Sequence, residues 1–156
     1  MDRHIANPDQ TLTVYYDKSC PVCRREIEGL DEATRGTKLK LVDCSLSAYA
    51  DDHAEQDNIS RKQMLDALHI RDAKGEWHSG IGAFSVLYRH VGLKRFGSLL
   101  SSKTLAPLLN GFYRWFARNR MAINRMFLPK LYVSWLTRRV RRLAQTKHQA
   151  SSTDGD

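Results

Sequence analysis

Two cysteines separated by two residues, Cys20 and Cys23, form the strongest chemical signal in this sequence. In a chain without a secretion signal, such a Cys-x-x-Cys pair is typical of redox or metal chemistry. A zinc site needs four ligands, and the sequence adds only Cys44 and scattered histidines without paired metal spacing. The pair therefore favours thiol–disulfide exchange, which needs a reductant or an oxidant but no organic or metal cofactor. A structural zinc site is the alternative.

The elements around the pair can be predicted from the spacing of apolar residues. Residues 11–16 alternate between two faces and are rich in β-branched and aromatic types, which indicates a strand. After the pair, helical spacing continues until Gly36, where a helix-ending glycine belongs, and residues 39–42 predict a second strand. The inward face of the helix is expected to carry Cys23, Ile27, Leu30 and Thr34.

The place of the cysteines at the start of this helix has chemical consequences. Cys20 is expected at the cap, with Pro21 in the first turn, where a missing backbone N–H costs nothing. The partial positive charge of a helix start can lower a thiol pKa from about 8.5 into the range of roughly 3.5–7.5. We therefore expect an exposed Cys20 to attack substrate disulfides and a shielded Cys23 to resolve the mixed disulfide. Asp17 either passes protons near the thiols or caps the loop, and Glu26 is expected to be a solvated helix residue.

A longer motif surrounds the pair. Residues 16–26 show Tyr-Asp-x-x-Cys-Pro-x-Cys-Arg-x-Glu after the predicted strand. Together with the stretches at 77–84 and 113–120, this motif resembles the DCC family of thioredoxin-like thiol-disulfide oxidoreductases, and the likeness covers residues 11–120. The resemblance implies a thioredoxin-like α/β core and an enzyme that exchanges disulfides with protein or small-thiol substrates. The alternative is a non-catalytic thioredoxin-like binding module, with the cysteines idle or metal-bound.

The family is named for an Asp and two Cys, and the resemblance assigns these to Asp17, Cys20 and Cys23. Lys18 stands where the family usually has glycine. The proline that thioredoxins carry just before the third strand has no counterpart here, and Met64 or Leu65 lies near that place in the sequence. The candidate substrate-binding residues are Tyr16, Pro21, Met64 and Leu65.

The rest of the predicted core follows the order helix, β-hairpin, helix. Residues 60–63 fit a capping box, residues 68–78 alternate around a turn as a hairpin, and residues 82–91 return to helical spacing. His69 and His78, on the two hairpin strands, are expected to be cross-strand surface residues rather than metal ligands.

The length of 156 residues predicts a single domain that is large enough to bury a core without disulfides. In chain order we expect a flexible N-terminus at 1–10, the thioredoxin-like core at 11–97, a helical basic extension at 98–148 and a disordered tail at 149–156.

Charge is distributed unevenly along the chain. Residues 1–76 carry 11 Lys and Arg against 15 Asp and Glu, whereas residues 77–153 carry 14 Lys and Arg and no acidic residue. The strongly basic second half of the chain suggests that the protein binds an anionic partner. The first ten residues lack the apolar run of a secretion signal, and no stretch approaches the roughly 18 apolar residues of a membrane span. We therefore expect a cytosolic protein without a transmembrane segment.

The last predicted helix, at 127–147, combines an apolar stripe with a cluster of arginines. We hypothesise that it docks on the inner face of an anionic membrane, with Tyr132, Trp135 and Leu136 in the headgroup boundary. In the alternative interpretation the stripe packs on the core and the arginines are only solvated. Nucleic acid is not expected as a partner, because no binding motif is present. The proposed contact residues are Trp135, Arg138, Arg139, Arg141 and Arg142.

Overall fold

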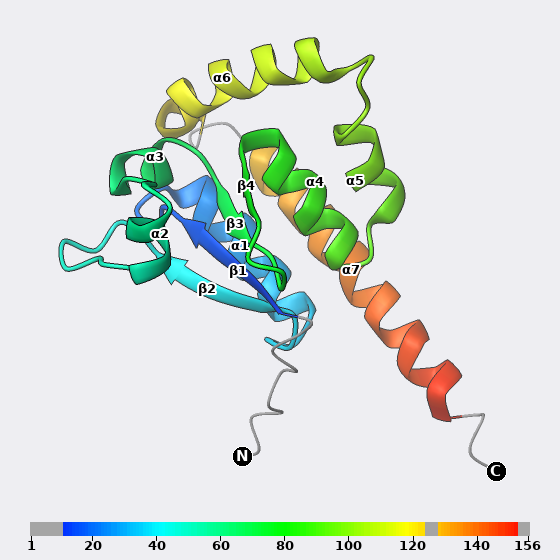
Figure 1. Ribbon diagram of the computed structural model, residues 1–156. Helices are drawn as coiled ribbons and strands as arrows, with labels where there is room; N and C mark the ends of the chain where they lie inside the picture. Colours follow the sequence, from blue (N-terminus) through cyan, green and yellow to red (C-terminus); the bar gives the residue numbers. More distant parts are fainter. Residues whose placement is uncertain (1–10, 124–127, 153–156) are drawn as a thin grey trace.

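The computed structural model describes residues 11–123 and 128–152 (Figure 1). The predicted flexible segment 1–10 lies outside the described residues. Of the tail predicted at 149–156, residues 149–152 belong to the last helix, and residues 153–156 also lie outside the described residues. In chain order the elements are β1 (Leu12–Tyr16), α1 (Pro21–Ala33), β2 (Leu39–Asp43), α2 (Asp52–Gln56), α3 (Arg61–Asp66), β3 (His69–Arg71), β4 (Trp77–Ser79), α4 (Gly80–His90), α5 (Lys94–Leu100), α6 (Ala106–Ile123) and α7 (Leu128–Ser152).

The strands form one sheet in the order β2-β1-β3-β4. β1 and β2 run parallel, with Leu12 opposite Leu39 and Tyr16 opposite Asp43, and α1 makes the crossover that a parallel pair requires. β3 is antiparallel to both β1 and β4. The predicted order of βαβ unit, helix, hairpin and helix is confirmed, and with it the mixed α/β, thioredoxin-like fold.

The two faces of the sheet carry different helices. Val14 lies in the main core, which α1, α4 and α7 complete, whereas the next residue, Tyr15, lies in a smaller cluster with Cys44 and Met64. This division follows from the strand period of two, which sends successive side chains to opposite faces. Figure 1 shows the result, with α2 and α3 gathered at one side of the sheet and α4 and α5 at the other.

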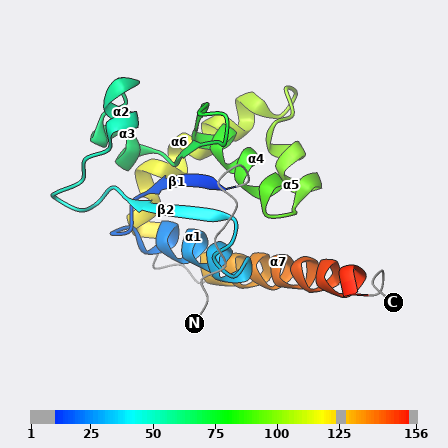
Figure 2. The same ribbon diagram turned by 60° about the horizontal axis from the view of Figure 1, so that its bottom comes forward.

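Helix α7 packs along α1, and Figure 2 shows the two side by side. Its buried residues Val133, Leu136 and Val140 recur at helical spacing. The helices approach closely at Gly29 of α1, where an added Cβ would lie 2.8 Å from the methyl carbon of Thr137. Leu136 and Val140 belong to the main core, whereas Tyr132 and Leu143 are exposed, so the interpretation that the stripe packs on the core is confirmed for the first two residues. Since Leu136 is fully buried, its predicted insertion among lipid headgroups is wrong.

Local sequence signals set the start of α3 and the hairpin turn. The Ser60 hydroxyl accepts the Gln63 N–H at 3.3 Å, and the Gln63 side chain accepts the Ser60 N–H at 2.8 Å, which confirms the capping box. In the hairpin, one carboxylate oxygen of Asp72 accepts the N–H groups of Lys74 and Glu76, each at 2.9 Å. The hairpin itself is confirmed as β3 and β4.

Candidate active site

The cysteine pair opens α1, as predicted. Cys20 is the N-cap residue with extended backbone, and Pro21 follows in the first turn. The Cys20 N–H donates to the Asp17 carbonyl at 3.2 Å, and the Cys20 carbonyl accepts the Arg24 N–H at 2.9 Å. Cys20 and Cys23 therefore both lie at the helix start, where the partial positive charge of the helix favours a thiolate.

The burial of the two cysteines is the reverse of the prediction. Cys20 is 0% exposed, whereas Cys23 is partly exposed, and neither forms a disulfide. Cys23 lies at the edge of the buried face of α1 rather than at its centre. Helical spacing locates an apolar stripe but does not tell which of its edges meets an opening, and this is why the prediction failed. The buried face of α1 consists of Val22, Glu26, Ile27, Leu30 and Ala33.

Cys23 lines a small cavity of about 30 Å³, which is enough for at least one water molecule. The end of β1, the first two turns of α1, the segment before β3, helix α4 and helix α6 all contribute to its wall. The cavity thus joins parts of the chain that are up to a hundred residues apart. Its lining residues are Tyr16, Asp17, Cys23, Glu26, Ile27, Met64, Ala67, Leu68, Phe84, Tyr113, Phe116 and Ala117.

The predicted substrate-binding residues divide between this cavity and other places. Tyr16 and Met64 line the cavity, and Pro21 and Leu65 are not part of its lining. Leu65 packs against the smaller cluster on the other face of the sheet. Met64 belongs to the same cluster and also lines the cavity, so it lies between the two, whereas Leu65 contacts only the cluster.

Helix α6 closes one side of the cavity with residues that the predicted site does not include. The Tyr113 hydroxyl accepts the Leu68 N–H at 3.2 Å, directly before β3. The Tyr113 ring also packs edge-on against Phe84, with the ring centres 6.1 Å apart. The resemblance at residues 113–120 was a signal for this helix, but helical spacing alone marks its aromatic residues only as packing groups.

Asp17 closes the loop between β1 and α1. One of its carboxylate oxygens accepts both the N–H and the hydroxyl of Ser19, the first at 3.0 Å. The side chain is buried and also lines the cavity beside Cys23. The loop-capping interpretation is therefore confirmed, and proton transfer by Asp17 remains a prediction.

Glu26 is buried at this site, and the expectation of a solvated residue is wrong. It is 7% exposed, its carboxylate accepts the Tyr88 hydroxyl, and that hydroxyl lies 3.0 Å from the hydroxyl of Tyr132. Burial raises the pKa of Glu26 to about 7; the Tyr88 hydrogen bond opposes the rise and the neighbouring Cys20 adds to it. A carboxyl with this pKa can accept or release a proton near neutrality. The sequence signal for this burial was the position of Glu26, three residues after Cys23 on the inward face of the helix.

Cys44 is a small, fully buried residue. Its sulfur lies 3.9 Å from the sulfur of Met64, within the smaller cluster on the opposite face of the sheet from α1. Burial raises the pKa of Cys44 to about 12, so it stays a thiol at neutral pH. It is therefore a natural control for the reactive pair.

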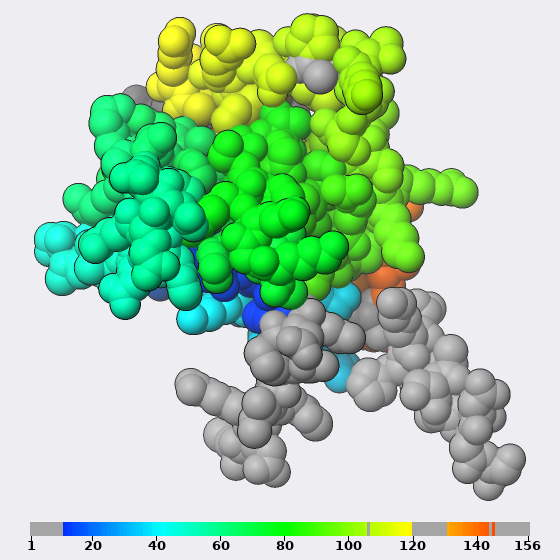
Figure 3. All heavy atoms as spheres, in the orientation of Figure 1, coloured from blue at the N-terminus to red at the C-terminus, as the bar shows by residue number. Residues whose placement is uncertain are grey.

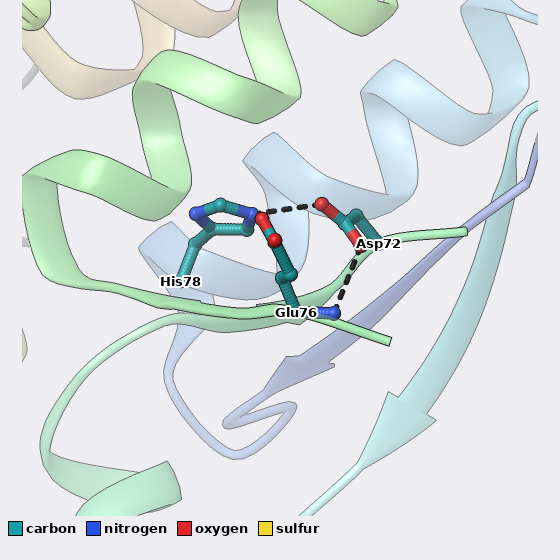
Figure 4. Close-up of side chains that lie close together, drawn as sticks. All are labelled: Asp72, Glu76 and His78. Carbon is teal, nitrogen blue, oxygen red and sulfur yellow. Dashed lines mark hydrogen bonds and ion pairs between the residues drawn. The ribbon is translucent and has the colours of Figure 1, made fainter. Parts of the chain in front are cut away.

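The hairpin gathers Asp72, Glu76 and His78, whose side chains point toward one another in Figure 4. Their ligand atoms lie within 4.8 Å of one another, and this is the only such group in residues 11–123 and 128–152. The His78 Nε2 is 3.1 Å from a carboxylate oxygen of Asp72, so the imidazole helps to hold the carboxylate that closes the turn.

His69, expected at the surface, is instead buried, with its Nδ1 2.9 Å from the Ala67 carbonyl oxygen.

The residues proposed for membrane contact lie on the outer side of α7. Trp135 is 50% exposed, with the Arg139 guanidinium 5.5 Å from its ring centre. All four arginines of the cluster are exposed, and Arg141 forms an ion pair with Glu32 of α1 at 3.6 Å. None of the helices in the described ranges is long and apolar enough to span a bilayer.

The burial of the cysteines predicts their order of alkylation in the native, reduced protein. We expect iodoacetamide to modify Cys23 first, because it alone of the three thiols is partly exposed, whereas Cys20 and Cys44 should react mainly through opening of the fold. Peptide mass spectrometry at successive times measures the order, and denatured protein supplies the unprotected rates. Faster modification of Cys20 than of Cys23 would contradict the described burial.

Comparisons with known proteins agree with this geometry. The model of the family described as DCC1-like thiol-disulfide oxidoreductase matches residues 14–126, which include β1, the cysteine pair and all of α6. An uncharacterized chloroplastic protein of Arabidopsis thaliana is 28% identical over 116 residues, which are 72% of this chain and 52% of that protein. The chain thus spans about half the length of the curated relative that it matches. No solved structure matches.

The family match covers most of the chain and contains the cysteines, the cavity and the helix that covers it. The chain belongs to the DCC1-like thiol-disulfide oxidoreductase family.

Proposed function

We propose that this protein is a cytosolic thiol–disulfide oxidoreductase in which Cys20 and Cys23 are the redox pair. The observation that carries the proposal is the cavity at the start of α1, whose lining includes both Cys23 and the buried Glu26. A helix start stabilises a thiolate, and a carboxyl with a pKa of about 7 can exchange a proton with a thiol. The site thus combines a pair of cysteines at a helix start with a carboxyl group that can exchange protons with them.

In the proposed reaction the Cys23 thiolate attacks one sulfur of a substrate disulfide. An enzyme–substrate disulfide forms, and the other substrate sulfur leaves as a thiol after it takes up a proton. Cys20 then attacks Cys23, the Cys20–Cys23 disulfide forms and the second substrate thiol is released. Glu26, which interacts electrostatically with Cys20, takes the proton from its thiol in this second step. A dithiol reductant returns the pair to the reduced state.

This order assigns the first attack to the thiol that the cavity reaches. The order expected from the sequence, attack by Cys20 and resolution by Cys23, needs a conformational change that uncovers Cys20. The two orders differ in which single variant can be trapped, because the mixed disulfide persists only when the resolving thiol is missing.

Three variants test the function and the order. Activity in a dithiothreitol-driven insulin reduction assay should fall to the uncatalysed rate in both Cys20→Ser and Cys23→Ser, and should persist in Cys44→Ala. After mixing with oxidised glutathione, Cys20→Ser should retain a glutathione adduct on Cys23, as detected by intact mass. Trapping in Cys23→Ser instead would reverse the order but keep the function. Unchanged activity in both variants would refute the function.

The second candidate is a non-catalytic binding module, and the small cavity together with the buried Cys20 favours it. In this case the cysteines are idle or hold a metal. The purified protein would then contain zinc in equimolar amount, lost on replacement of either Cys20 or Cys23, and it would show no insulin reduction. Zinc-free protein that turns over excludes this candidate.

A further inference from the structure

Helix α6 has a second apolar face that points away from the cysteine cavity. Tyr113, Phe116 and Ala117 face the cavity, whereas other large apolar side chains of the same helix are directed to solvent. We call the exposed set the α6 ridge. It consists of Leu108, Phe112 and Trp115, which are 72%, 60% and 55% exposed.

The α6 ridge is continuous along one side of the helix. Its residues are spaced by four and three positions, which places them on one face. The Phe112 and Trp115 rings contact each other, with centres 5.9 Å apart. Figure 3 shows α6, in yellow and yellow-green, as the outermost layer at the top of the molecule. A projecting apolar surface of this kind marks an interaction site more often than a lone exposed residue does.

The charge around the ridge indicates the partner. Arg114 and Arg118 of α6 are exposed, as is Lys103 just before the helix. No acidic residue occurs anywhere between residues 77 and 153. A helix with aromatic and aliphatic groups on one side, basic groups beside them and no acids has the composition of helices that lie in the headgroup layer of anionic membranes.

The same charge argues against a second copy of this chain as the occupant. Two α6 ridges placed face to face would bring Arg114 and Arg118 of both copies together, and residues 77–153 supply no carboxylate to neutralise them. Nucleic acid fits poorly as well, because the most exposed part of the surface is apolar.

We propose that the α6 ridge docks the protein on an anionic membrane surface, with Phe112 and Trp115 entering the headgroup boundary. The helix lies in the plane of the surface, in agreement with the absence of a membrane-spanning helix among the described residues. Its inner face then holds the cysteine cavity within about one helix diameter, roughly 10 Å, of the lipid. This proposal does not depend on the catalytic role of the cysteines.

Tryptophan quenching tests the proposal and separates α6 from α7. The probe is vesicles of brominated phosphatidylcholine, with and without phosphatidylglycerol. We expect quenching only with the anionic lipid, and less of it at higher salt. Trp115→Phe should remove most of the quenching, whereas the matched variant Trp135→Phe, which changes a similarly exposed tryptophan of α7, should retain it.

A second variant measures the affinity. Phe112→Ser should weaken sedimentation with anionic vesicles by about tenfold or more, because burial of a phenyl ring contributes at least that much. Since Phe112 is exposed, the thermal unfolding of the Phe112→Ser variant should match that of the parent protein. Loss of quenching only in Trp135→Phe, no binding to anionic vesicles, or a dimer in sedimentation equilibrium that Phe112→Ser dissociates would each overturn the proposal.

Discussion

Replacement of Glu26 by glutamine is expected to raise the free energy of unfolding by about 3 kcal/mol at about pH 8 and to change it little at about pH 4. The buried carboxyl has a pKa near 7 in the folded protein and an ordinary value of 4.5 when unfolded. The folded state therefore binds the proton more tightly. Its stabilising contribution is complete below about pH 4.5 and is lost as the pH rises toward 7. Glutamine resembles the protonated acid, keeps an acceptor for Tyr88 and never ionises.

Urea denaturation at several pH values between about 4 and 8 measures this effect. Glu32→Gln is the matched control, because its side chain is 71% exposed and its ion pair with Arg141 lies at the surface. That variant should follow the parent protein across the pH range. If Glu26→Gln is no more stable than the parent at the upper end, Glu26 does not titrate near neutrality, and its proposed role as proton acceptor fails with it.

Alanine at Gly97 is expected to lower the free energy of unfolding by about 3 kcal/mol. A Cβ at this position would lie 2.5 Å from Arg89 Cγ, 2.6 Å from the Ser85 carbonyl oxygen and 3.0 Å from the Arg89 nitrogen. Two of these atoms belong to the backbone of α4 and cannot turn aside. The clash also strains the bond from the Ser85 hydroxyl to the Gly97 carbonyl, now 2.8 Å. Helix α5 therefore requires glycine at its contact with α4.

Gly111→Ala in α6 is the control for the change of helix propensity. An added Cβ there meets nothing within 4 Å, so alanine should stabilise the helix by about 0.5–1 kcal/mol. Thermal and urea unfolding of the two variants should therefore shift in opposite directions. Equal stability of Gly97→Ala and the parent would mean that α4 and α5 are not held this closely.

The features predictable from the sequence are those whose causes are local. The start of α1 at Cys20 and Pro21, the capping box at Ser60 and the hairpin turn at Asp72 each depend on residues within four positions of one another. Such short-range geometry leaves a pattern that a single sequence displays. The arrangement of the strands could then be predicted as well, because a βαβ unit and a hairpin allow few topologies for a single sheet.

The candidate site was harder to predict because it depends on distant contacts. Glu26 is buried by Tyr88, which lies 62 residues later in the chain, and Leu68 is covered by Tyr113, 45 residues later. The charge of Glu26 and its helical position suggested a solvated side chain. Its burial results from the packing of α4 and α7 against α1, which the sequence pattern does not show. The burial of Cys20 likewise cannot be deduced from the pattern within α1.

The contribution of α7 to the main core bears on how the protein is made. Leu136 and Val140 belong to the same core as β1 and α4, although they follow α4 by roughly fifty residues, or several seconds of translation at about 5–20 residues per second. During that interval the nascent chain presents the uncovered apolar face of α1 to the ribosome surface and to chaperones. The nascent chain therefore remains prone to aggregation until α7 has left the ribosome and packed on α1.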